Sequence, residues 1–260
     1  MANQILNVPV IEKEFENQLI TKLNIDQFLK LDDTLTKNEG DTVTVVRYEG
    51  LNGVEALEMG SGNTETMEVK KTSHDYKVKC FQGRFPYYEE EFMTDSAAIE
   101  KGIAYMNEAM VNKMNSLAID EFLKSTNTLK NATWTYDNIV DACAKLNHES
   151  TDGFFMLISP AQEAAFKKSL KNELNYVEAF IRYGYIGNIN NLPIYVTKAV
   201  PDGKAIIANG NAVTLFLKAG TTYESERDAN TRKNTMYIRK YGVVALTDES
   251  YCVVLDSAAG

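Results

Sequence analysis

The side chains best suited to acid-base or metal chemistry are few in this sequence. His74 and His148 are its two histidines, and neither has a second histidine or a cysteine at ligand spacing. Cys80, Cys143 and Cys252 lie far apart and match neither a disulfide framework nor a metal-binding pattern, so we expect reduced thiols in a core. Phosphate-binding loops, nucleophile elbows and zinc-protease signatures are also missing. The sequence therefore predicts no catalytic, cofactor-binding or metal-binding residues.

Carboxylates are plentiful, and two of them brought together by the fold could perform acid-base catalysis. Glu89, Glu90 and Glu91 are consecutive, and so are Asp32 and Asp33. Runs of this kind usually lie on a solvated face. An α/β enzyme that uses a carboxylate pair therefore stays as a minor alternative, which a pocket with strongly perturbed carboxylates would favour.

A denser group of opposite charges lies late in the chain, next to a predicted strand. Alternating signs at such a place suit ion pairs with a neighbouring copy of the chain, although unpaired surface charge is an equally good interpretation. The candidate intersubunit contacts here are Glu224, Glu226, Arg227, Asp228 and Arg232.

A second candidate surface is a long hairpin predicted between Gly40 and Phe81. Residues 42–48 are β-branched and extended in character, and a second extended run covers residues 66–81. Because the second run is polar on both faces, it is either solvated or reaches out to another chain. Lys70 and Lys71, which point to opposite faces of this run, are the candidate contacts.

The apolar spacing predicts the elements that position these surfaces. Residues 11–31 form an amphipathic arm that needs a surface to lie on. Residues 94–126 form a helix of about 45 Å with one apolar stripe, which suits a helix that lies along a sheet. Later in the chain, helices and strands alternate without a clear linker, with helices at residues 137–148 and 160–174 around a buried strand at 153–159.

The composition narrows the class of protein. A chain of 260 residues with 44% hydrophobic residues can bury a sizeable core. Its net charge of -9 would repel the negatively charged phosphates of a nucleic acid, so we do not expect the chain to bind a specific nucleic-acid sequence. The pattern shows neither a membrane span nor a signal peptide, and it predicts folding in a cytosol without a membrane partner.

In their order, the predicted elements resemble the Hong Kong 97-like capsid fold of tailed double-stranded-DNA bacteriophages. Residues 184–196 are similar to the family's glycine-isoleucine-glycine, turn and leucine-proline-valine stretch, although Asn191 stands where glycine is commoner. Residues 222–228, followed by 235–246, resemble the charged segment and return strand of phage coat proteins. The resemblance covers nearly the whole chain.

The resemblance implies an α+β fold with an N-terminal arm, an extended β-hairpin loop, a long spine helix in a peripheral domain, and an α/β axial domain. It implies this division of the chain: arm, 1–39; hairpin, 40–84; peripheral domain, 85–135 and 216–239; axial domain, 136–215 and 240–260. Such a chain is expected to be a structural protein of the virion rather than an enzyme, assembled in the cytoplasm of a host bacterium.

The partners implied by the resemblance are first of all other copies of the chain. Capsid subunits of this kind form pentamers and hexamers of an icosahedral head, which encloses double-stranded DNA without reading its sequence. A portal protein, a separate scaffolding protein and decoration proteins are further expected partners. Bacterial nanocompartment shells have the same fold and load cargo enzymes instead of DNA, so they remain an alternative.

Overall fold

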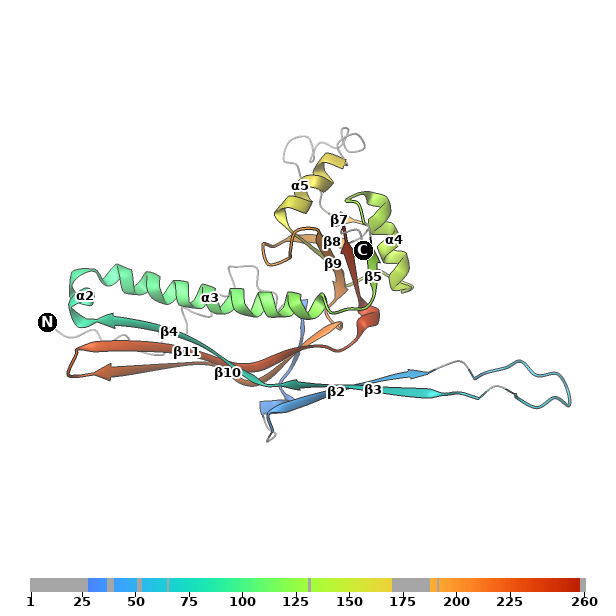
Figure 1. The fold of residues 1–260 in the computed structure, drawn as a ribbon, viewed down its shortest axis with the longest axis horizontal. Coiled ribbons are helices and arrows are strands. Elements are labelled where there is room, and N and C mark those ends of the chain that lie inside the picture. The colour runs from blue at the N-terminus through green and yellow to red at the C-terminus, as the bar shows by residue number, and fades with distance from the viewer. Residues whose placement is uncertain are drawn as a thin grey trace.

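A long helix lying along a narrow sheet forms one half of the molecule (Figure 1). The computed structural model describes residues 28–36, 40–50, 53–64, 66–130, 132–169, 188–190 and 192–257. Most of the predicted N-terminal arm and the 184–187 part of the resemblance therefore lie outside the described residues. Phe28, at the end of the arm, is buried, with its ring centroid 4.7 Å from that of Phe155 and 4.6 Å from that of Tyr195.

The helix, α3 (Ser96–Phe122), packs on a four-stranded sheet formed within the described residues. The strand order is β1 (Lys30–Asp32), β10 (Val213–Asp228), β11 (Lys233–Leu246) and β4 (Lys79–Tyr88). The apolar stripe predicted for the helix is buried at every position except Leu117, which is half-buried; the buried side chains are Ile99, Ile103, Met106, Met110, Met114 and Phe122. A short 3-10 turn, η2 (Thr34–Thr36), follows β1.

The predicted boundaries of this helix were partly wrong. Residues 94–126 were expected as one helix, but α3 ends at Phe122 and a separate short helix, α2 (Glu89–Thr94), precedes it. The two helices are divided at Asp95, whose φ of -147° and ψ of 89° are not helical. Glu89, Glu90 and Glu91 occupy the first turn of α2, where carboxylates are stabilised by the helix dipole.

A six-stranded sheet forms the second half of the described fold. Its strand order is β5 (Thr128–Lys130), β12 (Cys252–Asp256), β9 (Lys204–Asn209), β6 (Phe154–Ile158), β8 (Leu192–Val196) and β7 (Asn188–Ile189). Helices α4 (Tyr136–Leu146) and α5 (Pro160–Ser169) flank it, and η3 (Glu249–Tyr251) leads into β12. The predicted buried strand and both predicted helix starts are confirmed to within a residue; beyond Ser169 the second helix lies outside the described residues.

The central strand β6 shows why this sheet is buried on both faces. All five of its residues are buried, and alternate side chains join different apolar clusters because successive residues of a strand point to opposite faces. Phe155 and Leu157 belong to the cluster that contains Phe122 of α3. Phe154, Met156 and Ile158 belong to the cluster with Ile139 of α4 and Phe166 of α5.

The hairpin projects away from both halves (Figure 1). Its strands β2 (Thr42–Gly50) and β3 (Val69–Lys77) are antiparallel. The second extended run was predicted as one strand over residues 66–81, but it divides at Val78, whose amide donates to the carbonyl of Asp41 at 2.7 Å. Beyond this point β4 pairs with β11, and its alternate side chains from Phe81 to Tyr87 turn toward α3 and become half-buried.

Candidate assembly surfaces

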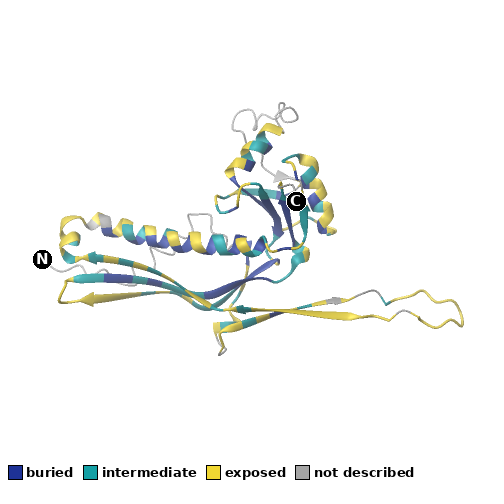
Figure 2. Cartoon of the chain, viewed as in Figure 1, coloured by how far each residue is buried: buried dark blue, intermediate teal, exposed yellow. Residues whose placement is uncertain are grey.

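Strand β3 of the hairpin has two faces that the rest of the described chain leaves largely uncovered. In β3 every residue from Val69 to Asp75 is exposed, and only Tyr76, close to the base, is half-buried (Figure 2). Lys70 and Lys71 lie in the outer part of the ribbon, with Cα partners Glu49 and Tyr48 in β2. Both predicted contact residues are therefore placed where another molecule can reach them.

Arg47 of β2 ties the hairpin to the body of the subunit. Its Nη2 donates to the carbonyl of Leu246 at 2.7 Å, and its Nε donates to the carbonyl of Thr247 at 3.0 Å. Its Nη1 forms an ion pair with the carboxylate of Glu249, in which the two side chains are 19% and 27% exposed. All three nitrogens of the guanidinium group thus have a partner, as its five N–H donors in one plane allow.

Glu249 extends this tie to the end of the long helix. Its Oε2 accepts from the amide of Thr126 at 3.2 Å and from the hydroxyl of the same residue. Burial raises the pKa of Glu249, but the hydrogen bonds from Thr126 and Arg47 outweigh it and leave the pKa below its usual range. The Arg47–Glu249–Thr126 set, which we term the hairpin joint, therefore connects β2, η3 and the chain just after α3.

The hairpin joint could not be predicted from the sequence. Its residues are separated by 202 and 123 positions, so no local pattern relates them. The one available signal was Arg47 itself, a single cation in the β-branched run at residues 42–48. A guanidinium in such a run requires acceptors, since a partly buried charge without hydrogen bonds is costly.

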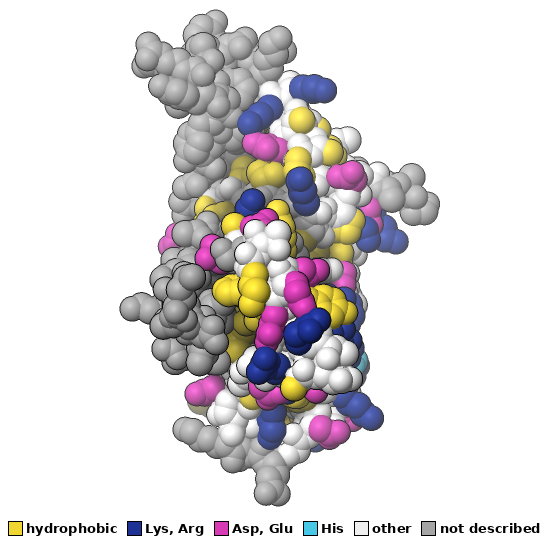
Figure 3. Space-filling view, turned by 90° about the vertical axis from the view of Figure 1, so that its left-hand side faces the viewer, with side chains coloured by type: hydrophobic (Ala, Val, Ile, Leu, Met, Phe, Trp, Pro, Cys, Tyr) yellow, Lys and Arg dark blue, Asp and Glu magenta, His cyan; other side chains and the backbone are white. Residues whose placement is uncertain are grey.

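The late charged group lies at the far end of the β10–β11 ribbon, beside α2. Arg227 Nη2 and Nε lie 2.6 and 2.9 Å from Glu89 Oε1, and Arg232 Nε lies 2.6 Å from Glu90 Oε1. Acidic, basic and hydrophobic side chains lie close together on this end of the molecule (Figure 3). The structure thus brings the predicted arginines to the acidic run that the sequence pattern favoured as a solvated face.

The other members of this group also have partners within the subunit. Glu224 pairs with Arg239, and Glu226 Oε2 accepts from the hydroxyl of Tyr237 at 3.1 Å. Asp228 shapes the turn between the strands, because its carboxylate accepts from Asn230 N at 2.9 Å and from Thr231 Oγ1 at 2.7 Å. The hydrogen bond from Thr231 is the main reason why the pKa of Asp228 lies below its usual range.

Of the residues considered for catalysis, His148 and Asp32 make contacts within the fold. His148 stacks on Tyr251 with centroids 4.6 Å apart and contacts the carbonyl of Ser250, while His74 is exposed on β3. Asp32 accepts from the amide of Thr34 at 2.9 Å, and hydrogen bonding to Thr34 lowers its pKa. Among the described residues, no three His, Cys, Asp or Glu side chains gather to hold a metal ion.

None of the described helices is long and apolar enough to cross a membrane.

A projecting hairpin, a long helix on a narrow sheet and a mixed six-stranded sheet define the Hong Kong 97-like fold of shell-forming proteins. The structural comparisons agree. The capsid of Cyanophage P-SCSP1u superposes with a TM-score of 0.69 at 9% identity, covering 92% of this chain and 89% of that one. The holo-SrpI encapsulin complex from Synechococcus elongatus PCC 7942 gives a TM-score of 0.66 at 13% identity, with 90% and 86% covered.

Sequence comparisons then identify the family to which the chain belongs. Residues 35–255 match the family described as phage capsid protein. The major capsid protein of Staphylococcus phage phiMR11 is 24% identical over 267 residues, with 100% of this chain and 96% of that protein covered. The chain belongs to the phage capsid protein family. It is a structural, non-enzymatic component of the virion, the shell-forming major capsid protein of a phage head, and it assembles with copies of itself.

Proposed function

We propose that the chain forms the pentamers and hexamers of an icosahedral head that encloses double-stranded DNA. The observation that carries the proposal is the hairpin, which is exposed on both faces of β3 yet tied to the body through Arg47. A ribbon that is held at its base and whose outer part is exposed suits contact with a neighbour. The expected division into arm, hairpin, peripheral and axial domains supports the same arrangement and stays a proposal.

The partners follow from this function. We expect a portal protein for DNA entry, a separate scaffolding protein during assembly, and decoration proteins on the outer face. DNA is expected to be held without sequence-specific contacts, since the net charge of -9 disfavours close binding to phosphates. A nanocompartment shell is the second candidate, supported by the likeness to the encapsulin structure.

Electron microscopy of particles tests the proposal. The chain is produced in bacteria with and without the other head proteins of its phage, and particles are imaged and treated with nuclease. Closed shells with five- and six-coordinated capsomers, and nuclease-resistant DNA in particles from infected cells, are expected. Shells that hold a protein cargo and never DNA would favour the nanocompartment, and the absence of any closed shell would contradict both.

We further propose that Lys70 and Lys71 make contacts with a neighbouring subunit. Charge reversal of both, Lys70→Glu with Lys71→Glu, should leave the free energy of unfolding within about 0.5 kcal/mol of the unchanged chain because both side chains are exposed. Shell yield should fall at least about tenfold, since a close charge pair contributes on the order of 1 to 3 kcal/mol and recurs at every contact. Circular dichroism and particle yield after sedimentation are the measurements.

A matched control keeps the change in net charge the same. Lys168 and Lys198 are exposed outside the hairpin, so Lys168→Glu with Lys198→Glu makes the same change in net charge away from the proposed contact, and normal shells are expected. A normal yield from Lys70→Glu with Lys71→Glu would remove Lys70 and Lys71 from the contact surface. The exposed pairs of Arg227 and Arg232 are a second proposed contact, because pairs that are about 60% exposed on the arginine side contribute little within the subunit and can exchange partners.

A further inference from the structure

A buried asparagine interrupts the apolar contact between α3 and its sheet. Asn107 lies in the middle of the helix and is only 3% exposed. Its Oδ1 accepts a hydrogen bond at 3.1 Å from the hydroxyl of Tyr223, which reaches over from β10. Burying an amide is costly even when the amide is paired, so a polar pair within an apolar contact is better suited to fixing one geometry than to adding stability.

The apolar part of this contact defines the position of the helix only loosely. Met106 and Met110 of α3 pack on Ile238 of β11. Nearer the start of the helix, Met236 of β11 packs with Ile103. Methionine is unbranched and adapts to irregular gaps, so contacts made by methionine tolerate more than one arrangement. Shape alone therefore does not hold the N-terminal part of α3 in one place.

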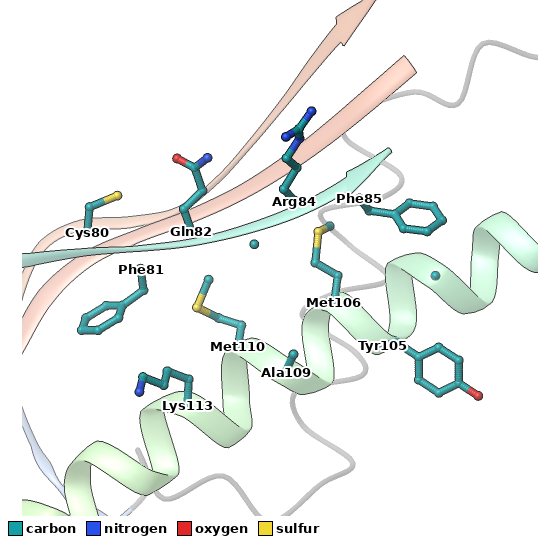
Figure 4. Close-up of a pocket in the computed structure, with 12 residues that line it drawn as sticks. Cys80, Phe81, Gln82, Arg84, Phe85, Tyr105, Met106, Ala109, Met110 and Lys113 are labelled. Carbon is teal, nitrogen blue, oxygen red and sulfur yellow. The ribbon is translucent and has the colours of Figure 1, made fainter. Parts of the chain in front are cut away.

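One flank of the helix also has room. A groove of about 630 Å3 lies between β4 and α3, and Met106 and Met110 project toward it from the helix (Figure 4). Opposite Met106 the strand carries Gly83, where an added Cβ would lie 2.9 Å from Met106 Cγ. Because β4 is the outer strand of its sheet in the described structure, no further strand closes this flank. A shift of the helix toward β4 would therefore close part of the groove rather than compress a packed core.

Asn107 holds the helix from the opposite flank. Successive residues of an α-helix are about 100° apart around its axis, so Asn107 points about 200° away from Tyr105. Tyr105 lines the groove, whereas Asn107 is tied to β10, two strands away from β4 in the sheet. We propose that Asn107 and Tyr223 are positioning residues: their hydrogen bond fixes where the N-terminal part of α3 lies across the four-stranded sheet, and correct shell assembly depends on that place.

The consequence for assembly follows from where α3 is anchored. Its C-terminal end is fixed by Phe122, which is fully buried in the cluster shared with the six-stranded sheet. A shift across the sheet therefore moves the N-terminal end most, and α2 lies directly before that end. The carboxylates of α2 pair with Arg227 and Arg232, which are a proposed contact with a neighbouring subunit. The inference rests on the proposed assembly and adds what sets the geometry of this end of the subunit.

Replacement of both partners separates position from stability. Asn107→Leu with Tyr223→Phe removes the hydrogen bond and leaves apolar side chains of nearly the same shape, so the midpoint of urea unfolding should stay unchanged or rise. The yield of shells with the normal diameter should fall at least about fivefold, which is the bias that one such hydrogen bond gives between two arrangements of a subunit. Sedimentation and electron microscopy of the assembled particles measure this yield.

Distances between spin labels report the position of the helix directly. Nitroxide labels are attached at Lys101→Cys on α3 and Thr222→Cys on β10, which are both exposed, in a Cys80→Ser background that removes the exposed native thiol. The unassembled subunit should give one narrow distance distribution, and the double variant a broader or a second one. Because no shell is needed, this measurement decides the inference even if the unchanged chain forms no shells, a result that would contradict the proposed function alone.

The matched control makes the same two chemical changes at exposed positions. Asn112→Leu on α3 with Tyr136→Phe at the start of α4 should give normal shells and the same single distance. Either normal shells or an unchanged narrow distance distribution in the Asn107→Leu, Tyr223→Phe variant would overturn the inference. A marked fall in the unfolding midpoint of that variant would overturn it too, because the pair would then hold the fold together rather than choose between positions.

Discussion

Replacement of Arg47 with methionine should lower the free energy of unfolding of the unassembled subunit by about 2 to 3 kcal/mol. The guanidinium donates hydrogen bonds to three acceptors: the carbonyls of Leu246 and Thr247 and the carboxylate of Glu249. Methionine has a similar apolar length but no donor, so a partly buried carboxylate and two carbonyls lose their partner. The joint is about one fifth to one quarter exposed, which is why we expect less than the cost of breaking a fully buried pair.

Urea denaturation followed by circular dichroism measures this change. Arg47→Lys is the informative companion, because it keeps the charge but cannot reach three acceptors with one planar fork, and it should lie between the methionine variant and the unchanged chain. An Arg47→Met variant within 0.5 kcal/mol of the unchanged chain would show that the joint contributes nothing measurable. We also expect the methionine variant to assemble poorly even at temperatures at which it is folded, since its hairpin is no longer tied to β11.

Phe122→Ala should be more damaging still, with a loss of about 3 to 5 kcal/mol. Phe122 is fully buried at the end of α3, and its ring meets that of Phe155 edge-on at 6.2 Å. It lies in the cluster shared by the spine helix and the six-stranded sheet, so the cavity would open between the two halves of the fold. Tyr105→Ala removes a ring from the same helix at an exposed position and should change the unfolding free energy by about 0.5 kcal/mol or less.

Thermal and urea unfolding of both variants at one protein concentration checks this contrast. The expected order is the unchanged chain, then Tyr105→Ala close to it, then Phe122→Ala well below. Equal losses from the two variants would mean that the contact between α3 and the six-stranded sheet contributes no more to the free energy of unfolding than an exposed position does.

The parts of the fold with strong periodic patterns could be predicted from sequence. The apolar stripe of α3 and the fully apolar run of β6 each encode their burial locally, because helix and strand periods leave distinct signatures. The division between β3 and β4 could not be predicted, because both read as extended chain. Their separation at Val78 depends on whether the partner strand is β2 or β11, and β11 begins more than 150 residues later.

The candidate surfaces could be predicted only in part, because exposure of a strand is a local property whereas the pairing of distant charges is not. Exposure of Lys70 and Lys71 follows from a strand without an apolar face, which is a local property. The acidic run at Glu89 and Glu90 and the arginines at 227 and 232 were each recognised as charged, but their pairing needs β4 and β11 to be neighbours. Tertiary contacts decide such pairs, and no spacing in one sequence reports them.

The hairpin joint also has a consequence for natural variation among related capsid proteins. Two of the three acceptors of Arg47 are backbone carbonyls, which every amino acid supplies, so side chains at positions 246 and 247 are free to drift as far as this contact is concerned. The third acceptor is a side chain, Glu249, and it must change together with Arg47 or not at all. In an alignment of relatives, positions 47 and 249 should therefore covary, while 47 should show no covariation with 246 or 247 arising from this contact.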